Sequence, residues 1–204
     1  MIEVECNQGS REWTEARLGI PTASQAYRLI TPKTRKPSSQ QDGYINDLLV
    51  EMELGEPADA AISDFMQRGH DLEPQAIKYY EFLRDVNVRR PGFIHTDDRT
   101  FGCSPDFLVG EDGGGEIKTP SASNHMAFLR GRMDDKYVAQ MQSSMWVTGR
   151  AWWDFISWNP VLPPVVRRYH RDDIFIAQFA KIVAEFTALL RGEKARIEGD
   201  GHGP

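Results

Sequence analysis

The sequence predicts an α/β (α+β) domain in which helices flank one central mixed sheet. Apolar residues recur at helical spacing near both ends of the chain, whereas the middle alternates short apolar runs with Gly, Pro and Asp. A length of 204 residues fits a single domain. A composition of 40% hydrophobic and 26% charged residues is ordinary for a globular protein and excludes wholesale disorder.

Four helices are predicted in the N-terminal half, from apolar spacing or from a capping residue. They span residues 10–17, 22–30, 44–54 and 63–84. Ser10 and Thr22 are the expected N-caps of the first two helices. Gly69 and Pro74 are points at which the fourth could be interrupted. Residues 31–43, rich in Pro, Ser and charge, are expected to form an exposed loop.

The rest of the chain is predicted to form the sheet and its last helices. Strands are expected at residues 88–95, 100–109, 115–119, 151–158 and 165–170, and helices at 134–148 and 172–191. The run EDGGG at 111–115 is typical of a hairpin loop. We therefore expect one domain over residues 1–191, followed by a flexible tail over 192–204.

Charge and cysteine content exclude several classes of protein. With only Cys6 and Cys103, the chain has neither a disulfide framework nor a four-cysteine iron–sulfur cluster. No apolar run approaches the length of a membrane span, and the polar, acidic start is unlike a signal peptide, so an intracellular protein is expected. The net charge of −6 does not exclude an enzyme that handles DNA through metal ions and a local basic patch.

The most informative segment places Asp106 ten residues before Glu116. In a hairpin centred on Glu111 these two residues lie opposite one another, with Cβ atoms about 5 Å apart. Two carboxylates so close repel unless one is protonated or a cation lies between them. A divalent metal meets that need, and oxygen ligands suit Mg²⁺ or Mn²⁺.

Lys118 completes this pattern. Because side chains alternate along a strand, Glu116 and Lys118 share one face, while Ile117 points into the core and leaves its carbonyl available as a ligand. The lysine can orient a water or neutralise a phosphate oxygen, which together describes metal-assisted attack of water on a phosphodiester. By itself, the pattern also fits a surface hairpin with scattered charges.

Several further landmarks occur in order along the chain, from the start of the first helix to the predicted helix at 134–148. They are Gln8-Gly9-Ser10, Trp13, Arg17-Leu18-Gly19, Thr22-Ala23-Ser24, Gly69, Glu73, Cys103-Ser104-Pro105-Asp106, Glu116-Ile117-Lys118 and the run from Tyr137 to Thr148. With these landmarks the chain resembles the PD-(D/E)xK nucleases, and among them the lambda exonuclease or YqaJ-type phage recombinase family. That resemblance implies a restriction-endonuclease-like fold.

The resemblance also implies roles for individual residues. Asp106 and Glu116 are similar to the family's metal-binding carboxylates, with the Ile117 carbonyl as a further ligand, Lys118 as the catalytic lysine and Glu73 as an additional acid near the metals. The residues implied to hold the 5′-phosphate or to border the DNA are Arg17, Ser24, Ser104, Tyr137, Gln140 and Gln142. A basic cluster of Lys33, Arg35 and Lys36 is either a solvated loop or an arm that grips duplex DNA.

As a function, the resemblance implies a Mg²⁺-dependent 5′→3′ exonuclease with two metal ions, for which Mn²⁺ can substitute. It would degrade one strand of linear duplex DNA to 5′-mononucleotides, favour 5′-phosphorylated ends and leave a 3′ overhang for annealing recombination. A homotrimeric ring, a phage single-strand annealing protein as partner and the cytoplasm of a bacterial host are implied in the same way.

Two alternatives remain open from the sequence. A structure-specific or restriction-type endonuclease of the same fold would share Asp106, Glu116 and Lys118 without needing the phosphate pocket. A non-catalytic module that binds DNA ends is the other alternative, against which the complete set of carboxylates and lysine argues.

Overall fold

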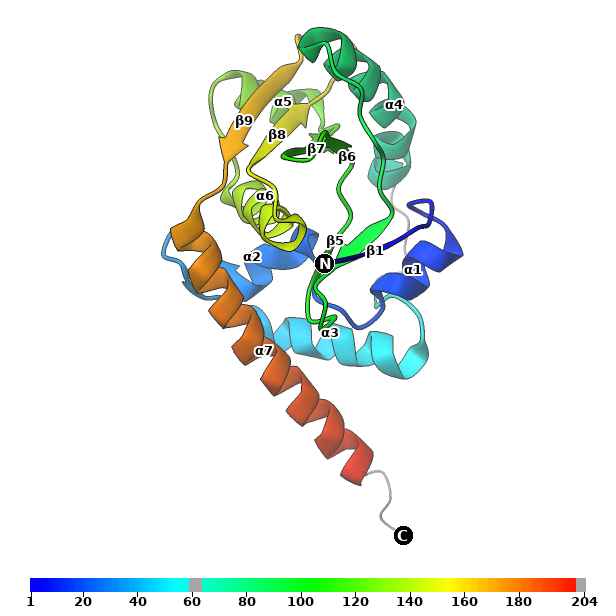
Figure 1. The fold of residues 1–204 in the computed structure, drawn as a ribbon, viewed down its shortest axis with the longest axis vertical. Coiled ribbons are helices and arrows are strands. Elements are labelled where there is room, and N and C mark those ends of the chain that lie inside the picture. Colours follow the sequence, from blue (N-terminus) through cyan, green and yellow to red (C-terminus); the bar gives the residue numbers. More distant parts are fainter. Residues whose placement is uncertain (59–63, 201–204) are drawn as a thin grey trace.

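A computed structural model describes residues 1–58 and 64–200. Within these residues the chain forms seven α-helices, one short 3₁₀ helix and nine strands (Figure 1). The helices are α1 (Arg11–Arg17), η1 (Ala23–Gln25), α2 (Ala26–Leu29), α3 (Gln41–Leu54), α4 (Asp64–Arg84), α5 (Ala122–Leu129), α6 (Asp135–Thr148) and α7 (Asp173–Asp200). The strands are β1 (Ile2–Val4), β2 (Ile30–Thr31), β3 (Lys36–Pro37), β4 (Phe93–His95), β5 (Gly102–Cys103), β6 (Phe107–Val109), β7 (Gly113–Lys118), β8 (Trp152–Ser157) and β9 (Val165–His170).

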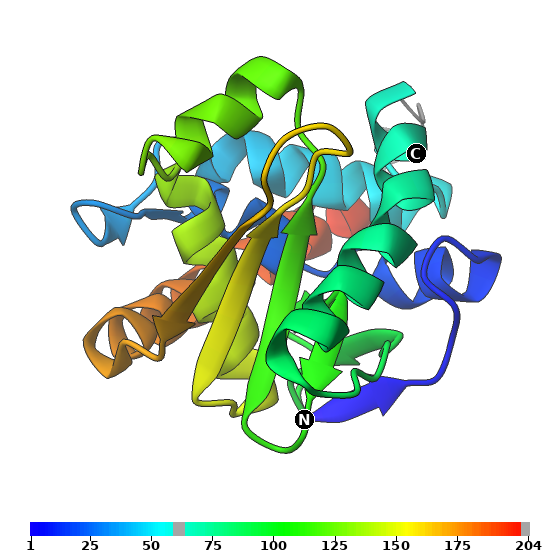
Figure 2. The ribbon, with the colours of Figure 1, turned by 90° about the horizontal axis from the view of Figure 1, so that it is seen from above.

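The largest sheet is mixed and has four strands in the order β6-β7-β8-β9. β7 and β8 are parallel, while the outer pairs, β6 with β7 and β8 with β9, are antiparallel. A parallel pair needs a long crossover connection, which α5 and α6 supply. In Figure 2 this sheet lies between α4 on the near side and α6 behind it.

Alternation along the strands explains this layering. Ile117 and Ile156 point to one face, where they pack with Ala76, Ile77 and Tyr80 of α4. The intervening side chains of β8, Trp153 and Phe155, belong to the larger core on the other face, which also contains Met141 and Met145 of α6. A sheet covered on both faces needs apolar residues on both, and β7 and β8 provide them.

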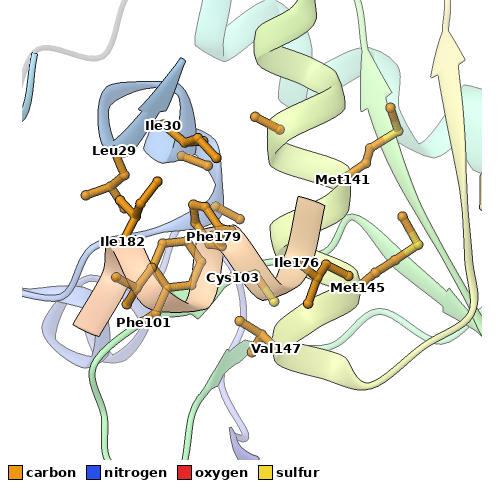
Figure 3. Close-up of a cluster of buried hydrophobic side chains, with 14 of the residues drawn as sticks. Leu29, Ile30, Phe101, Cys103, Met141, Met145, Val147, Ile176, Phe179 and Ile182 are labelled. Carbon is orange, nitrogen blue, oxygen red and sulfur yellow. The ribbon is translucent and has the colours of Figure 1, made fainter. Parts of the chain in front are cut away.

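The larger core fills the space between α6, α7 and the N-terminal helices. Figure 3 shows Phe179 and Ile182 of α7 near Leu29, Phe101 and other buried side chains. Cys103 lies in this core with 1% of its surface exposed. Burial of this many apolar side chains is the main source of stability for such a fold.

A second sheet of three antiparallel strands, in the order β1-β4-β5, lies beside the mixed sheet. The prediction of one central sheet did not include it, because β1 has only three residues and β5 only two, which is too short for a periodic signal. A two-stranded hairpin, β2 with β3, occupies part of the segment expected to be a loop.

Several predicted elements are confirmed. Ser10 accepts a hydrogen bond from Trp13 N at the start of α1, α6 covers nearly the whole predicted range, and β9 has the predicted bounds. The predicted helix start at residue 63 lies outside the described residues. Pro74 lies inside α4 without ending it, because the residues that follow, Ala76 among them, stay packed on the sheet.

Several expectations about secondary structure are wrong, among them the Thr22 cap, which makes no side-chain hydrogen bond to the helix, and the strand over 100–109, which is two strands in different sheets. The glycines of EDGGG belong to β7, so the hairpin loop is shorter than expected. Helix α5, capped by Ser121, was missed. The last helix continues past Arg191 to Asp200, although most of its final residues are exposed. Residues 201–204 lie outside the described part of the chain. Among the described residues, no helix is long and apolar enough to cross a membrane.

Candidate active site

The β6–β7 hairpin brings two carboxylates together. Phe107 pairs with Gly115, so one step further along the same register Asp106 lies opposite Glu116, as the sequence predicted. Oδ2 of Asp106 accepts a hydrogen bond of 2.5 Å from the backbone N of Ile117. The Glu116 side chain is 5% exposed and Asp106 is half-buried, so this hairpin holds two acids that are only partly hydrated.

Glycine makes this close hairpin possible. A Cβ atom on Gly115 would lie 1.9 Å from the Phe107 ring, and one on Gly114 would lie 2.4 Å from the Trp153 ring. Aromatic rings of the neighbouring strands therefore occupy the space that side chains on β7 would need. The run of glycines serves strand packing rather than turn formation, which is why reading it as a loop failed.

Charge repulsion in the hairpin is strong. Burial, and then the nearby charges of Glu116 and Glu73, raise the pKa of Asp106 well above its usual range. Burial alone would lower the pKa of Lys118, but Glu116 and Asp106 outweigh it and the pKa of the lysine is raised. Lys118 Nζ lies 2.6 Å from Glu116 Oε1, so the site draws cations toward its acids.

The donors here fit a hard divalent metal. N–H and C=O of one strand residue point to the same side, so the Ile117 carbonyl faces the side on which its N–H meets Asp106. The described residues contain no group of three His, Cys, Asp or Glu side chains close enough to hold a metal. A metal would thus rest on Asp106, Glu116, this carbonyl and oxygens from water and substrate, which is the pattern that Mg²⁺ prefers.

Glu73 lies on α4 near this cluster, since its charge contributes to the raised pKa of Asp106. Its carboxylate forms an ion pair with Arg90, which sequence analysis did not single out. The Glu73 side chain is 18% exposed and the Arg90 side chain 47%. No periodicity or motif indicates Arg90, because its partner lies 17 residues upstream on a different element.

A second cluster, formed by Trp13, Arg17 and Ser104, adjoins the hairpin. The Arg17 guanidinium lies 3.9 Å from the centre of the Trp13 ring, and Trp13 Nε1 donates to Ser104 Oγ at 2.9 Å. Ser104 is two residues before Asp106, so Trp13 joins α1 to the segment that carries Asp106. The structure therefore brings Arg17 and Ser104 together through a residue to which the sequence gave no role.

Arg17 differs from most arginines on a surface helix in the burial of its guanidinium Nε. Its Nε is buried and has no hydrogen-bond partner within the described part of the chain. Burial lowers its pKa, against the raising effects of Tyr44 and Glu51. A buried guanidinium N–H without an acceptor suits an anion that brings its own oxygens.

Ser24 is exposed in η1, where its Oγ lies 3.2 Å from Thr22 Oγ1. Thr22 forms a bridge with Gly102, two residues before Ser104. Ser24 therefore stands at the rim of the same region.

Helix α6 borders the site with Tyr137 and Gln140. The Lys118 Nζ lies 5.2 Å from the centre of the Tyr137 ring, within the range of a cation–π contact. Gln140 follows three residues later, on the same side of the helix, and is buried.

The structure does not bring Gln142 to this site. Its Nε2 donates to His170 O, and its Oε1 accepts from Asp172 N, both at 2.8 Å. These bonds fasten α6 to the junction of β9 and α7. Two residues along a helix correspond to a turn of about 200°, so Gln142 cannot share the face of Gln140.

The basic cluster is engaged with acidic residues. Lys33 lies 3.2 Å from Asp135 at the start of α6, and Arg35 lies 2.8 Å from Asp172 at the start of α7. Arg35 and Lys36 line an open groove of about 730 Å³ beside Ile174. Lys33 is thus at the end of α6 that carries Tyr137, whereas Arg35 and Lys36 face α7.

The chain matches the family described as the YqaJ-like viral recombinase domain over residues 12–151. Two solved structures of the alkaline exonuclease LHK-Exo from Laribacter hongkongensis, one of them in complex with dAMP, are 33% and 34% identical to it, each with a TM-score of 0.84 over 94% of this chain and 98% of the other. A phage-related exonuclease from Haemophilus somnus 129PT shares the fold at 15% identity, with a TM-score of 0.67 over 85% of this chain and 96% of that one. A comparison with curated proteins gave no match. The matches agree with the resemblance and the fold class expected from the sequence.

Proposed function

The chain belongs to the YqaJ-like viral recombinase family, and from this premise we propose that it is a Mg²⁺-dependent 5′→3′ exonuclease acting on the ends of linear duplex DNA. The observation that carries the proposal is the cluster of Asp106, Glu116 and Lys118 next to Arg17, whose buried Nε has no hydrogen-bond partner among the described residues. The likeness to LHK-Exo, an alkaline exonuclease, supports the exonuclease class.

The arrangement of the two clusters supports the 5′→3′ direction. Ser104 belongs to the Arg17 cluster through Trp13, and Asp106 belongs to the metal-binding hairpin, yet only Pro105 separates them. A terminal 5′-phosphate held by Arg17, Ser24 and Ser104 would therefore place the next phosphodiester over the carboxylates. Cleavage there releases 5′-mononucleotides and leaves a 3′ overhang. The dAMP complex of LHK-Exo agrees with a mononucleotide product.

In the proposed reaction the chain's own residues bind the metal ions and orient the DNA and the attacking water. Mg²⁺ would be held by Asp106, Glu116 and the Ile117 carbonyl. We propose two Mg²⁺ ions, with Glu73 as a further ligand, and Mn²⁺ could replace Mg²⁺. When bound, the metal lowers the pKa of water and stabilises the charge of the transition state. The Lys118 ammonium forms an ion pair with Glu116 in this structure. During the reaction it can instead contact a phosphate oxygen or orient the attacking water.

Tyr137 and Gln140 line the side of the hairpin along which DNA would lie. The Tyr137 ring restrains the Lys118 ammonium from one side. Among the basic residues we propose Lys33 as the one that contacts duplex DNA, since its ion pair with Asp135 holds it near the end of α6 that carries Tyr137.

The wider setting proposed for this activity rests on the family. We propose a homotrimeric ring, because a protein of net charge −6 gains little from general attraction to DNA and would hold it better by enclosure. A single-strand annealing protein of phage type would receive the 3′ overhang, in the cytoplasm of a bacterial host.

The test is an assay in Mg²⁺ on linear duplex DNA labelled at one 5′ end or one 3′ end, with a closed circular control. Early release of the 5′ label as mononucleotide from an otherwise protected duplex, with an intact circle, is the expected result. Internal cuts or a nicked circle would replace the proposal with an endonuclease. End binding without any cleavage would replace it with a DNA-end-binding module.

A further inference from the structure

Gln8 makes two hydrogen bonds to which the proposed reaction gives no role. Its Nε2 donates to Pro91 O at 3.0 Å and to Pro105 O at 2.8 Å. A primary amide has two N–H groups, so this pair of carbonyls uses both of them. We propose that Gln8 is a positioning residue that fixes the two segments on which the active-site carboxylates depend. The inference rests on the proposed function.

The local backbone explains why a side chain is needed at this point. Residue 89 forms an antiparallel bridge with β6, in which Arg89 N donates to Leu108 O at 2.9 Å and Leu108 N donates to Arg89 O at 2.7 Å. In this register the next hydrogen-bonded pair toward Asp106 would be Pro91 with Asp106, and Pro91 has no N–H to donate. Among the described residues no backbone hydrogen bond joins residues 91 and 106, and the Gln8 amide connects the two segments there instead.

Each of these carbonyls is one residue away from a functional side chain. Pro105 directly precedes Asp106, and Pro91 directly follows Arg90, the partner of Glu73. Acids that repel one another need a rigid frame to keep the spacing that a metal requires. Gln8 connects the segment bearing Asp106 to the segment that anchors Glu73.

The residues around Gln8 are themselves fixed. Gly9 has a φ of +85°, which favours glycine, and Ser10 caps α1, the helix that carries Trp13 and Arg17. A Cβ on Gly92 would lie 2.3 Å from Val4 O, so the N-terminal segment packs directly on the 90–92 segment. The run Gln8-Gly9-Ser10 therefore joins the phosphate-binding cluster to the metal-binding hairpin.

The test compares Gln8→Leu with Gln41→Leu. Gln41 is a matched control, since its Nε2 also donates to a distant backbone carbonyl, Leu29 O at 2.8 Å, but outside the site. Mn²⁺ affinity of the DNA-free protein is measured by calorimetry at a temperature where both variants are folded. In Gln8→Leu we expect this affinity and kcat each to fall about tenfold, with KM for duplex DNA changing much less. Gln41→Leu should change none of the three.

Mn²⁺ affinity and kcat in Gln8→Leu equal to those of Gln41→Leu would overturn the proposal. So would a lower melting temperature with unchanged Mn²⁺ affinity, because that result describes a structural role only. If Gln8→Leu does not fold, Gln8→Asn replaces it, since the shorter amide cannot span both carbonyls. A wild-type protein that binds Mn²⁺ in a Gln8-dependent way but does not cleave DNA would refute the proposed function and leave the positioning role standing.

Discussion

The hairpin of Asp106 and Glu116 and the cluster of Arg17 and Ser104 are neighbours that arise in different ways. The hairpin is local, since its acids lie ten residues apart and strand register alone places them opposite each other. The Arg17 cluster joins α1 to residue 104 through one tryptophan, 91 positions away in the sequence. A site of the first kind follows from strand periodicity, whereas one of the second kind exists only after the chain has folded.

This difference gives the two regions separable chemical roles. The hairpin concentrates negative charge, and its internal cation is Lys118. The other cluster presents a buried guanidinium whose Nε has no acceptor within the described residues. We therefore propose that the first region binds metal ions and the second an anion, so variants in the two regions should fail in different ways.

The largest effect is expected in the hairpin. Asp106→Asn should lower nuclease turnover at least about 1,000-fold, which corresponds to about 4 kcal/mol in the barrier. Because the pKa of Asp106 is raised in the fold, its charge destabilises the native state, and the variant should melt no lower than the wild type near neutral pH. Turnover and thermal melting are measured side by side. Asp112→Asn, in the exposed loop of the same hairpin, is the control. Turnover within tenfold of wild type would refute the assignment of Asp106.

Exchanging the metal tests the hairpin without a mutation. Ca²⁺ should support DNA binding but reduce turnover at least about 100-fold relative to Mg²⁺, because its longer and looser coordination misplaces the reacting water. Binding to a labelled duplex and release of nucleotide are measured with each ion. Brisk turnover in Ca²⁺ would contradict the proposed geometry of the carboxylates.

The Arg17 cluster should show a selective loss. Arg17→Ala should slow cleavage of 5′-phosphorylated ends about 10- to 100-fold, the value of one charged hydrogen bond or more, and should affect 5′-hydroxyl ends much less. Initial rates on the two substrates give this ratio. Arg11→Ala, on the same helix but 87% exposed, should leave it unchanged. An equal loss on both substrates would remove the phosphate pocket from the account.

The smallest effect on activity is expected at Gln142. Gln142→Ala removes two partly buried hydrogen bonds at the β9–α7 junction and should lower the free energy of unfolding by about 1–3 kcal/mol. Denaturant unfolding measures this loss. Turnover well below the melting transition should stay near that of the wild type, whereas Gln140→Ala should reduce it. A large loss of turnover in folded Gln142→Ala would restore Gln142 to the DNA-binding surface.

Local features of this molecule can be predicted from the sequence, whereas features that depend on distant contacts cannot. The hairpin register, α6 and β9 depend on local spacing, and the prediction from that spacing is confirmed. The short strand β1 exists only because β4 pairs with it, so no local pattern could reveal it.

The errors have physical causes as well. The glycines at 113–115 were predicted to form a loop. They are needed because aromatic rings on the neighbouring strands, those of Phe107, Trp152 and Trp153, lie against the β7 backbone, and no local pattern reveals those rings. The DNA-bordering role that the resemblance gives to Gln142 stays a prediction, although helical spacing turns its side chain to a different face from that of Gln140. Gln8 was noted as a landmark without a role, since its partners are 83 and 97 residues away.

The central claim is that both regions act on the same DNA end. A crystal structure of this chain with Mn²⁺ and a 5′-phosphorylated duplex, with anomalous scattering to locate the metal, tests it most directly. We expect Mn²⁺ between Asp106, Glu116 and the Ile117 carbonyl, and the terminal phosphate on Arg17 and Ser104. Metal bound elsewhere, or a 5′-phosphate away from Arg17 while Mn²⁺ occupies the hairpin, would contradict it.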